Sequence, residues 1–323
     1  MTHLPRSNSP RTDSTPPFPD LPAREGGVGA VVVTYNRKAL LEKCLRSLLA
    51  QTASLDRIYV VDNASTDGTP DIIPSDDRVT YLRLPQNLGG AYGFARGVEL
   101  ALKGDHTSLW LMDDDCLPEP EALAELLAYG NGVEVRCSAV LARDGRYDLY
   151  HRRRFDALRL KEDNLPAREY AVSGATVDLF TFVGPLIPTE VIRRAGLPVD
   201  NFFFAYDDFE YALRLRRLGV GARLVPSSRL WHHGSLSCPS PRGPYNPLKH
   251  YYNTRNQLLV YREYGTSAPW YVLRFAVKTA GAFIRLMQHR ELSVNSARTA
   301  AQALYDALRG RAYVRPPPTA AGR

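Results

Sequence analysis

The 323-residue sequence predicts an α/β protein with a doubly wound, mainly parallel sheet flanked by helices, and with further helices at its C-terminal end. Residues 30–34 form a continuous, largely β-branched run, which is typical of a strand buried on both faces. Strand and helix patterns then alternate through the first half of the chain, as in repeated βα units. Asp62 and Asp113 fall at predicted strand ends, and such sheets bind ligands at the carboxyl ends of their strands.

Each element follows from the spacing of apolar residues and from the turn residues that bound it. In the first half we expect strands at 30–34, 58–61, 79–82 and 109–112, and helices at 40–49, 90–103 and 119–128. In the second half we expect strands at 177–183 and 222–225, helices at 189–194 and 206–218, and a loop rich in Gly, Pro and Ser at 226–247. Three helices should complete the chain, at 247–264, 268–290 and 294–309.

Composition divides the chain into four parts. Residues 1–25 are rich in Pro, Ser and Arg without an apolar segment, so we expect a disordered leader rather than a signal peptide, and residues 313–323 form a similar tail. Between them we expect a main domain at 26–265 and a helical extension at 266–312. No stretch is long and charge-free enough to cross a bilayer, which predicts a cytoplasmic protein that rests at most on the inner face of the cell membrane.

The overall charge favours anionic partners. The net charge is +7, and the positive excess suits nucleotide phosphates, an acidic membrane surface or nucleic acid. We find no nucleic-acid-binding motif, so we expect no nucleic acid partner. The four cysteines are scattered without CxxC pairs, which argues against a structural zinc site and a disulfide framework and indicates a reducing compartment.

Three adjacent carboxylates, Asp113, Asp114 and Asp115, follow the apolar run 109–112 directly. Their mutual repulsion calls for a counter-charge. A helix cap would use Asp115 but would leave the other two unexplained. Carboxylates around a sharp strand-end turn converge on one hard cation, and Mn²⁺ or Mg²⁺ prefers such oxygens together with substrate phosphates. We therefore favour a metal site over a helix cap.

Two further segments of the first half are candidates for nucleotide binding. Asp62 closes the second strand, where it either forms a turn beside Asn63 or accepts the imide N–H of uracil or thymine. Residues 87–93 follow a strand and open a helix, so their backbone N–H groups could meet an anion, although a simple tight turn explains them equally well.

The acidic segment that opens the helix at 206–218 has two compatible interpretations. Asp207 followed three residues later by Glu210 is the pattern of a capping box. The aromatic run 202–206 places Asp208 beside a wall on which a sugar ring could stack, which favours a general base. Farther along, His232 follows Trp231 in the predicted loop, where a metal ligand and an ordinary surface histidine are equally good interpretations.

Taken in order, these segments resemble the family 2 glycosyltransferases, which have the GT-A fold and transfer sugars with inversion. The resemblance covers about residues 29–265. The triple Asp, the paired Asp that opens a later helix and the downstream Trp-His look most like galactofuranosyltransferases of actinobacterial cell walls, with bacterial rhamnosyltransferases a close second. The segments that carry the resemblance are Val33-Thr34-Tyr35-Asn36-Arg37, Val61-Asp62-Asn63-Ala64-Ser65-Thr66-Asp67, Asn87-Leu88-Gly89-Gly90, the Asp triplet, Tyr206-Asp207-Asp208-Phe209-Glu210-Tyr211 and Trp231-His232.

The resemblance implies a role for each matching position. Asp208 would be the catalytic base, and the metal ligands would be Asp113, Asp115 and His232. The acceptor would meet Phe204, Tyr206 and Asp207. The nucleotide-sugar would be held by Thr34, Arg37, Asp62, Asn87, Gly89, Asp113 and Asp114.

The implied activity is metal-dependent transfer of a sugar, with galactofuranose favoured, from a UDP- or dTDP-sugar to a hydroxyl of a glycan acceptor. Rhamnosyl transfer from dTDP-rhamnose is the alternative. The cation would take up charge as the diphosphate leaves. The base removes the hydroxyl proton late, so an Asp of near-normal pKa is sufficient. A glycan-binding protein with a decayed site is the rival class, and the retained acids and histidine argue against it.

The C-terminal helices suggest where the acceptor lies. On the helix 268–290, Arg274, Lys278, Arg285 and His289 share one face and most apolar residues lie away from it, so it either lies in a membrane interface or packs on the catalytic domain. An interfacial helix suits an acceptor linked to polyprenyl diphosphate. Residues 251–256 either contact that acceptor or, in the interpretation that we prefer, connect their helix to the catalytic domain.

Overall fold

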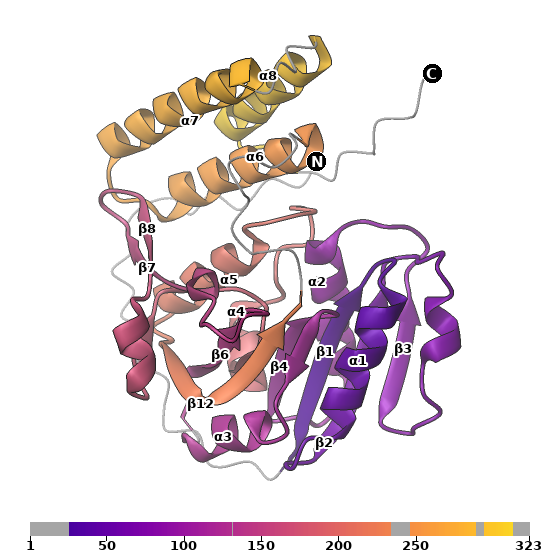
Figure 1. Cartoon of the computed structure of the whole chain (residues 1–323). Helices are drawn as coiled ribbons and strands as arrows, with labels where there is room; N and C mark the ends of the chain where they lie inside the picture. The colour runs from indigo at the N-terminus through magenta and orange to yellow at the C-terminus, as the bar shows by residue number, and fades with distance from the viewer. Residues whose placement is uncertain (1–25, 131, 234–245, 289–293, 313–323) are drawn as a thin grey trace.

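The computed structural model describes residues 26–130, 132–233, 246–288 and 294–312. The expected leader, 1–25, and tail, 313–323, lie outside the described residues. The centre of the molecule is a mixed, mostly parallel sheet in the strand order β3-β2-β1-β4-β11-β6-β12-β5, with the short β9 paired to β12 (Figure 1). The predicted fold class is confirmed. The strands of this sheet are β1 (Val28–Thr34), β2 (Leu55–Asp62), β3 (Val79–Arg83), β4 (Ser108–Asp113), β5 (Cys116–Pro118), β6 (Val135–Leu141), β9 (Thr176–Val177), β11 (Pro185–Pro188) and β12 (Ala222–His232).

Helices cover both faces of this sheet because alternate residues of its strands point to opposite sides. Val32 of β1 packs with helices α1 and α3, whereas Val31 and Val33 pack with α2, α4 and α5. Both faces are therefore apolar, as the continuous hydrophobic strands predicted. These helices are α1 (Lys38–Leu49), α2 (Gly90–Ala101), α3 (Ala122–Ala128), α4 (Thr189–Ala195) and α5 (Asp207–Arg217).

A second, smaller unit of strands lies beside the main sheet. It has the order β10-β7-β8 and is antiparallel throughout. Short 3₁₀ helices connect the surrounding segments, and one of them, η2, ends directly before β7. The elements are β7 (Arg152–Asp156), β8 (Lys161–Asn164), β10 (Leu179–Phe180), η1 (Thr69–Ile72), η2 (Leu149–His151) and η3 (Ala167–Ala171).

Three C-terminal helices form a layer beyond the carboxyl end of β12, with α7 and α8 farthest from the sheet (Figure 1). They are α6 (Pro247–Tyr264), α7 (Ala268–Gln288) and α8 (Val294–Arg309), close to the predicted bounds. An apolar cluster that includes Phe209 of α5 and Leu259 of α6 connects this layer to the catalytic domain. Within the described part of the chain, no helix has both the length and the apolar character that a membrane span needs.

The structure corrects three expected elements. The strand expected at 177–183 is two short strands, β9 and β10, in different sheets. The helix expected from 119 begins at Ala122, because the chain first forms strand β5. The strand expected at 222–225 continues to His232, so the N-terminal part of the expected loop 226–247 is strand, while residues 234–245 lie outside the described residues.

Candidate active site

The candidate active site lies where the carboxyl ends of β1, β2 and β4 come together. Parallel pairing places Thr34 beside Asp62 and Val33 beside Asp113. The polypeptide turns sharply after β4, and the Asp114 N–H donates to the Val33 carbonyl at 3.2 Å. The predicted strand-end residues therefore share one edge of the sheet.

Asp114 is held by the residues expected to bind the nucleotide. Thr34 Oγ1 donates to Asp114 Oδ2 at 2.7 Å, and the Arg37 guanidinium lies 3.2 Å from Asp114 Oδ1 and 2.6 Å from Asp115 Oδ2. Burial raises the pKa of Asp114 to about 6, against the lowering effect of Thr34 and Arg37. Arg37 is half exposed, so it supplies part of the counter-charge that the triplet requires.

His232 reaches the Asp triplet through strand pairing. The end of β12 runs antiparallel to β5, which places His232 opposite Cys116, and the His233 N–H donates to the Asp115 carbonyl at 2.8 Å. As a result, His232 Nε2 lies 3.2 Å from Asp115 Oδ1. One ligand atom from each of Asp113, Asp115 and His232 lies within 4.8 Å of the others.

This group of three fits a divalent cation. Two carboxylates and an imidazole form an oxygen-rich donor set that suits Mn²⁺ or Mg²⁺. The buried Oδ1 of Asp115 lacks a regular hydrogen bond within the described chain and faces His232. Burial, together with the charges of Asp115 and Asp114, raises the pKa of Asp113. A cation would relieve that repulsion.

Asp208 lies close enough to the triplet to be affected by its charge. Burial and the charge of Asp207 raise the pKa of Asp208 well above its usual range, and Asp113 adds to the shift. The pKa of Asp208 thus lies above the near-normal value that is sufficient for a general base. Asp208 Oδ1 accepts a hydrogen bond from the Phe209 N–H at 2.7 Å.

The expected capping box at the start of α5 is absent. Helix α5 begins at Asp207, its N-cap residue is Tyr206, and no side chain caps it. Glu210 instead pairs with Arg214 and accepts a hydrogen bond from the Tyr264 hydroxyl at 2.7 Å, so it connects α5 to α6. The helix cap at Asp115, the less favoured interpretation of that residue, is also absent, because α3 begins after β5 with Glu121 as its N-cap residue.

The loop before Asp208 has an unusual backbone. Phe203, Ala205 and Tyr206 all have positive φ angles, of 63°, 62° and 68°, which are costly for residues with a Cβ. The Asn256 side-chain amide of α6 donates to three carbonyls of this loop, those of Phe202 at 3.1 Å and of Phe204 and Ala205 at 2.9 Å. These contacts support the interpretation of 251–256 as a connection between α6 and the catalytic domain.

The predicted acceptor residues differ in exposure. Phe204 is exposed, whereas Asp207 is buried. Tyr206 is also buried, and its hydroxyl donates to Glu162 at 3.1 Å. Of the three, Phe204 thus has the most surface available to a sugar.

The predicted nucleotide residues outside the triplet have structural partners. Asp62 accepts hydrogen bonds from the Ser65 N–H at 2.8 Å and the Tyr81 hydroxyl at 2.5 Å, so it does form a turn. The Asn87 side chain accepts from the Gly89 N–H at 2.9 Å, just before α2. The expected contacts of Asp62 with the nucleobase and of Asn87 with the nucleotide or diphosphate stay predictions.

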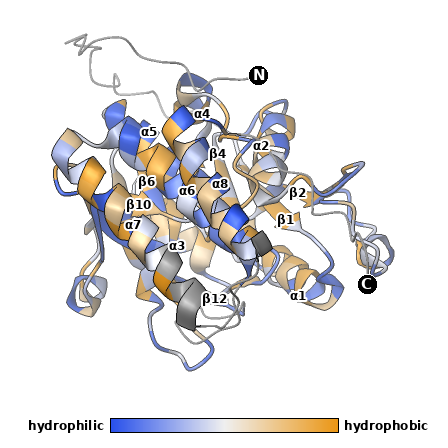
Figure 2. Cartoon of the chain, turned by 90° about the horizontal axis from the view of Figure 1, so that it is seen from above, coloured by the Kyte–Doolittle hydropathy of each residue, from blue (hydrophilic) through white to orange (hydrophobic). Residues whose placement is uncertain are grey.

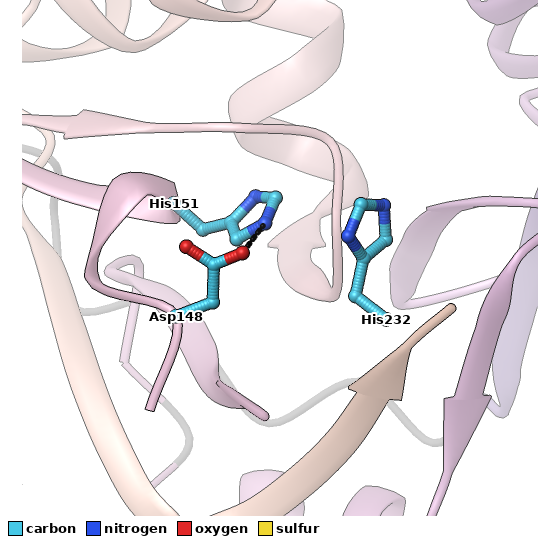
Figure 3. A group of neighbouring side chains, drawn as sticks. All are labelled: Asp148, His151 and His232. Carbon is cyan, nitrogen blue, oxygen red and sulfur yellow. Dashed lines mark ion pairs between the residues drawn. The ribbon is translucent and has the colours of Figure 1, made fainter. Parts of the chain in front are cut away.

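Two polar residues beside the site were missed from the sequence. Figure 3 shows Asp148 and His151 next to His232, and ligand atoms of these three also lie within 4.8 Å of one another. His151 is buried, and its ring meets that of His232 edge-on with centroids 4.9 Å apart. Burial lowers the pKa of His151 to about 4, which keeps this imidazole neutral. The Asp-x-x-His spacing was the available signal.

Solved structures with the same architecture define the class of fold. The chain aligns with TarS 1–349 of S. aureus in complex with UDP-GlcNAc at a TM-score of 0.56 and 13% identity, covering 88% of this chain and 81% of that one. It aligns with the mannosyltransferase PcManGT of Pyrobaculum calidifontis, in complex with GDP-Man and Mn²⁺, at a TM-score of 0.52 and 20% identity, covering 91% and 78%. The protein therefore has the GT-A fold of glycosyltransferases.

Sequence comparison then gives the family. Residues 30–181 match the model of glycosyl transferase family 2. The chain is 32% identical over 209 residues to the galactofuranosyltransferase GlfT1 of Mycobacterium tuberculosis, which covers 60% of this chain and 66% of that protein. It is 23% identical over 242 residues to the dTDP-rhamnosyl transferase RfbF of Shigella flexneri, covering 72% and 79%. Residues 30–181 of this chain are thus a glycosyl transferase family 2 domain.

Proposed function

We propose that this protein is an inverting, metal-dependent glycosyltransferase that moves galactofuranose from a UDP- or dTDP-sugar to a hydroxyl of a lipid-linked glycan. One observation carries the proposal. One ligand atom from each of Asp113, Asp115 and His232 lies within 4.8 Å of the others, so one divalent cation could bind all three side chains. The galactofuranosyltransferase relative supports this choice of sugar.

Different residues of the site would bind the cation and remove the proton in an inverting transfer. Asp113, Asp115 and His232 would hold Mn²⁺ or Mg²⁺, which supplies Lewis-acid stabilisation of the departing diphosphate. Asp208 takes the proton from the acceptor hydroxyl as that oxygen attacks. General bases typically contribute about 10²–10⁴-fold to rate.

We assign the contacts with the nucleobase and the diphosphate to residues at or just after the carboxyl ends of β1, β2 and β3. Thr34 and Asp62 lie side by side at the strand ends and would meet the pyrimidine, with Arg37 and Asn87 near the nucleotide or diphosphate. A second candidate donor is dTDP-rhamnose, which the rhamnosyl transferase relative favours.

We further propose that the helical layer rests on the inner face of the cell membrane, near a polyprenyl-diphosphate acceptor. On α7, an apolar stripe of Leu273, Val277, Ala280 and Ile284 is exposed. Orange, hydrophobic segments of α7 are visible from above the layer (Figure 2). An exposed apolar stripe on an outer helix is the arrangement of an interfacial helix. Of the cationic face expected there, His289 lies outside the described residues.

A donor panel with the variant Asp208→Asn tests the proposed reaction. Wild-type protein with Mn²⁺ should transfer sugar from UDP-galactofuranose to a glycan acceptor, and EDTA should abolish transfer. Asp208→Asn should retain nucleotide binding by calorimetry and lose transfer by about 10²-fold or more, as expected for a lost general base.

Other outcomes would identify other functions. Transfer only from dTDP-rhamnose would select the second donor. Donor binding without any transfer would indicate a glycan- or nucleotide-sugar-binding protein. Release of free sugar without acceptor would indicate a hydrolase. Near-normal transfer by Asp208→Asn would show that this residue is not the base.

A further inference from the structure

We propose that Asp148 and His151 are positioning residues that fix the orientation of His232, so that its Nε2 atom faces Asp115 and a bound cation. The inference rests on the proposed metal-dependent function. It assigns a role to two residues that lie outside the ligand set of Asp113, Asp115 and His232.

The His151 ring has a protein partner at each of its two nitrogens. Its Nδ1 lies 2.7 Å from Thr181 Oγ1, and its Nε2 lies 3.4 Å from Asp148 Oδ2. The backbone carbonyl of His151 accepts a hydrogen bond at 2.8 Å from the guanidinium of Arg152, and Arg152 is fully buried. Because both ring nitrogens face protein partners, His151 is poorly suited to bind a cation of its own.

The Asp148 carboxylate is also held in place. It is the N-cap residue of η2, and its Oδ1 accepts a hydrogen bond from the Tyr150 N–H at 3.2 Å. Its other oxygen faces His151. The carboxylate therefore sits at a fixed position beside His232 (Figure 3).

The two ring nitrogens of His232 have different roles in this proposal. Nε2 faces Asp115 at 3.2 Å, while Asp148 and His151 lie close to the same imidazole. A histidine that binds a metal through one nitrogen usually directs its other N–H to a carboxylate or carbonyl, which fixes its tautomer and ring orientation. Asp148 has a carboxylate oxygen within 4.8 Å of a His232 ring nitrogen, and we assign this carboxylate that role. The edge-on ring of His151 restricts rotation of the imidazole.

The experiment is a calorimetric titration of the full chain with Mn²⁺ in the absence of nucleotide-sugar. Asp148→Asn keeps an oxygen to cap η2 but removes the charge. We expect it to weaken Mn²⁺ binding by about tenfold or more, the usual effect of losing such an outer partner. The matched control is Asp144→Asn, an exposed residue that pairs with Arg146 in the preceding turn. It should bind Mn²⁺ like the wild type.

A double-variant comparison separates positioning from a general structural effect. If Asp148 acts through His232, Asp148→Asn should cause little further loss of Mn²⁺ affinity in a His232→Ala background. An unchanged affinity in the single variant, or an equal loss in both backgrounds, would overturn the inference. So would a second bound ion that disappears in Asp148→Asn, since Asp148 would then be a ligand. Wild-type protein that binds no Mn²⁺ would contradict the metal-dependent function itself, and this inference with it.

Discussion

At the scale of single residues, Gly89 shows how closely the first half of the chain approaches the loop that presents Asp208. Its φ is +91°, and a Cβ atom placed there would lie 2.1 Å from the Phe203 carbonyl oxygen. A side chain at this position would thus be strained and would also push on the strained loop 202–206. Gly89 is needed for this contact, in addition to the nucleotide-binding role that the resemblance implies.

Gly89→Ala should therefore destabilise the protein. The positive φ, together with a ψ of 168°, alone costs roughly 1–3 kcal/mol for a residue with a Cβ, and the displaced Phe203 carbonyl adds to the cost. We expect a lower melting temperature by differential scanning calorimetry and a loss of transfer. The matched control is Gly90→Ala, where a Cβ would meet nothing within 4 Å, and where Ala favours the helix. Equal melting temperatures for the two variants would contradict this explanation.

The candidate metal ligands were the residues of the site most readily proposed from the sequence, and their neighbours were the least. The sequence indicated a site at the Asp triplet, because three adjacent negative charges after a buried strand require a counter-charge. Part of that charge comes from Arg37, which the resemblance implied only as a nucleotide contact. Asp148 and His151 gave no comparable signal, because their significance depends on His232, which is distant in sequence.

At the scale of elements, α6 holds the Asp208 loop in a conformation that the loop would not adopt alone. Asn256 donates to its carbonyls, Arg255 Nε donates to Asn256 Oδ1 at 2.8 Å, and the Phe203 ring stacks on Tyr252 with centroids 4.9 Å apart. Helix α6 therefore shapes the loop that precedes Asp208.

Asn256→Ala should consequently impair transfer more than donor binding. Buried carbonyls left without a donor cost about 1–3 kcal/mol each, and the loop should relax away from its positive φ angles. We expect a lower kcat with a nearly unchanged affinity for the nucleotide in calorimetry. Asn253→Ala, on the same helix and half-buried, is the control. Weakened nucleotide binding equal to the fall in kcat would argue for a general loss of folding.

Strand β12 shows why element boundaries were hard to predict. Pro226 and the serines after it indicate a loop, because proline cannot donate to a ladder. In the structure, pairing of β12 with β6 shifts register between Val225 and Arg229 and then resumes up to Trp231. Pro226 lies within this bulge, where no ladder hydrogen bond is needed from it, and the bulge bends the strand. Only the tertiary partner β6 reveals that the strand continues.

At the scale of the whole molecule, the helical layer leaves apolar side chains exposed on the outside. Leu273 is 49% exposed, Val277 54% and Ile284 52%. On the adjacent α8, Tyr305 and Leu308 are exposed as well. Because this layer lies beyond the carboxyl end of β12, contact with a membrane there would bring the active site close to a lipid-linked acceptor (Figure 1).

Replacing Leu273, Val277 and Ile284 together by Ser should weaken binding to anionic vesicles. Full burial of such side chains is worth about 1.5–3 kcal/mol each, and partial insertion of three should amount to at least tenfold in a vesicle sedimentation assay at low salt. The folded state exposes these residues, so the melting temperature should hold. Val172→Ser, at an exposed site on the main domain, is the control. Wild-type protein that ignores anionic vesicles would contradict the membrane proposal.

The pairing of β5 with β12 has a consequence for how the protein is made. The three carboxylates are synthesised early, but the imidazole that completes their group arrives only after β12 has been translated and has docked against β5. A nascent or truncated polypeptide that stops short of this strand would carry the acids without their partner. Ion capture that depends on His232 would thus begin only once β12 has docked against β5.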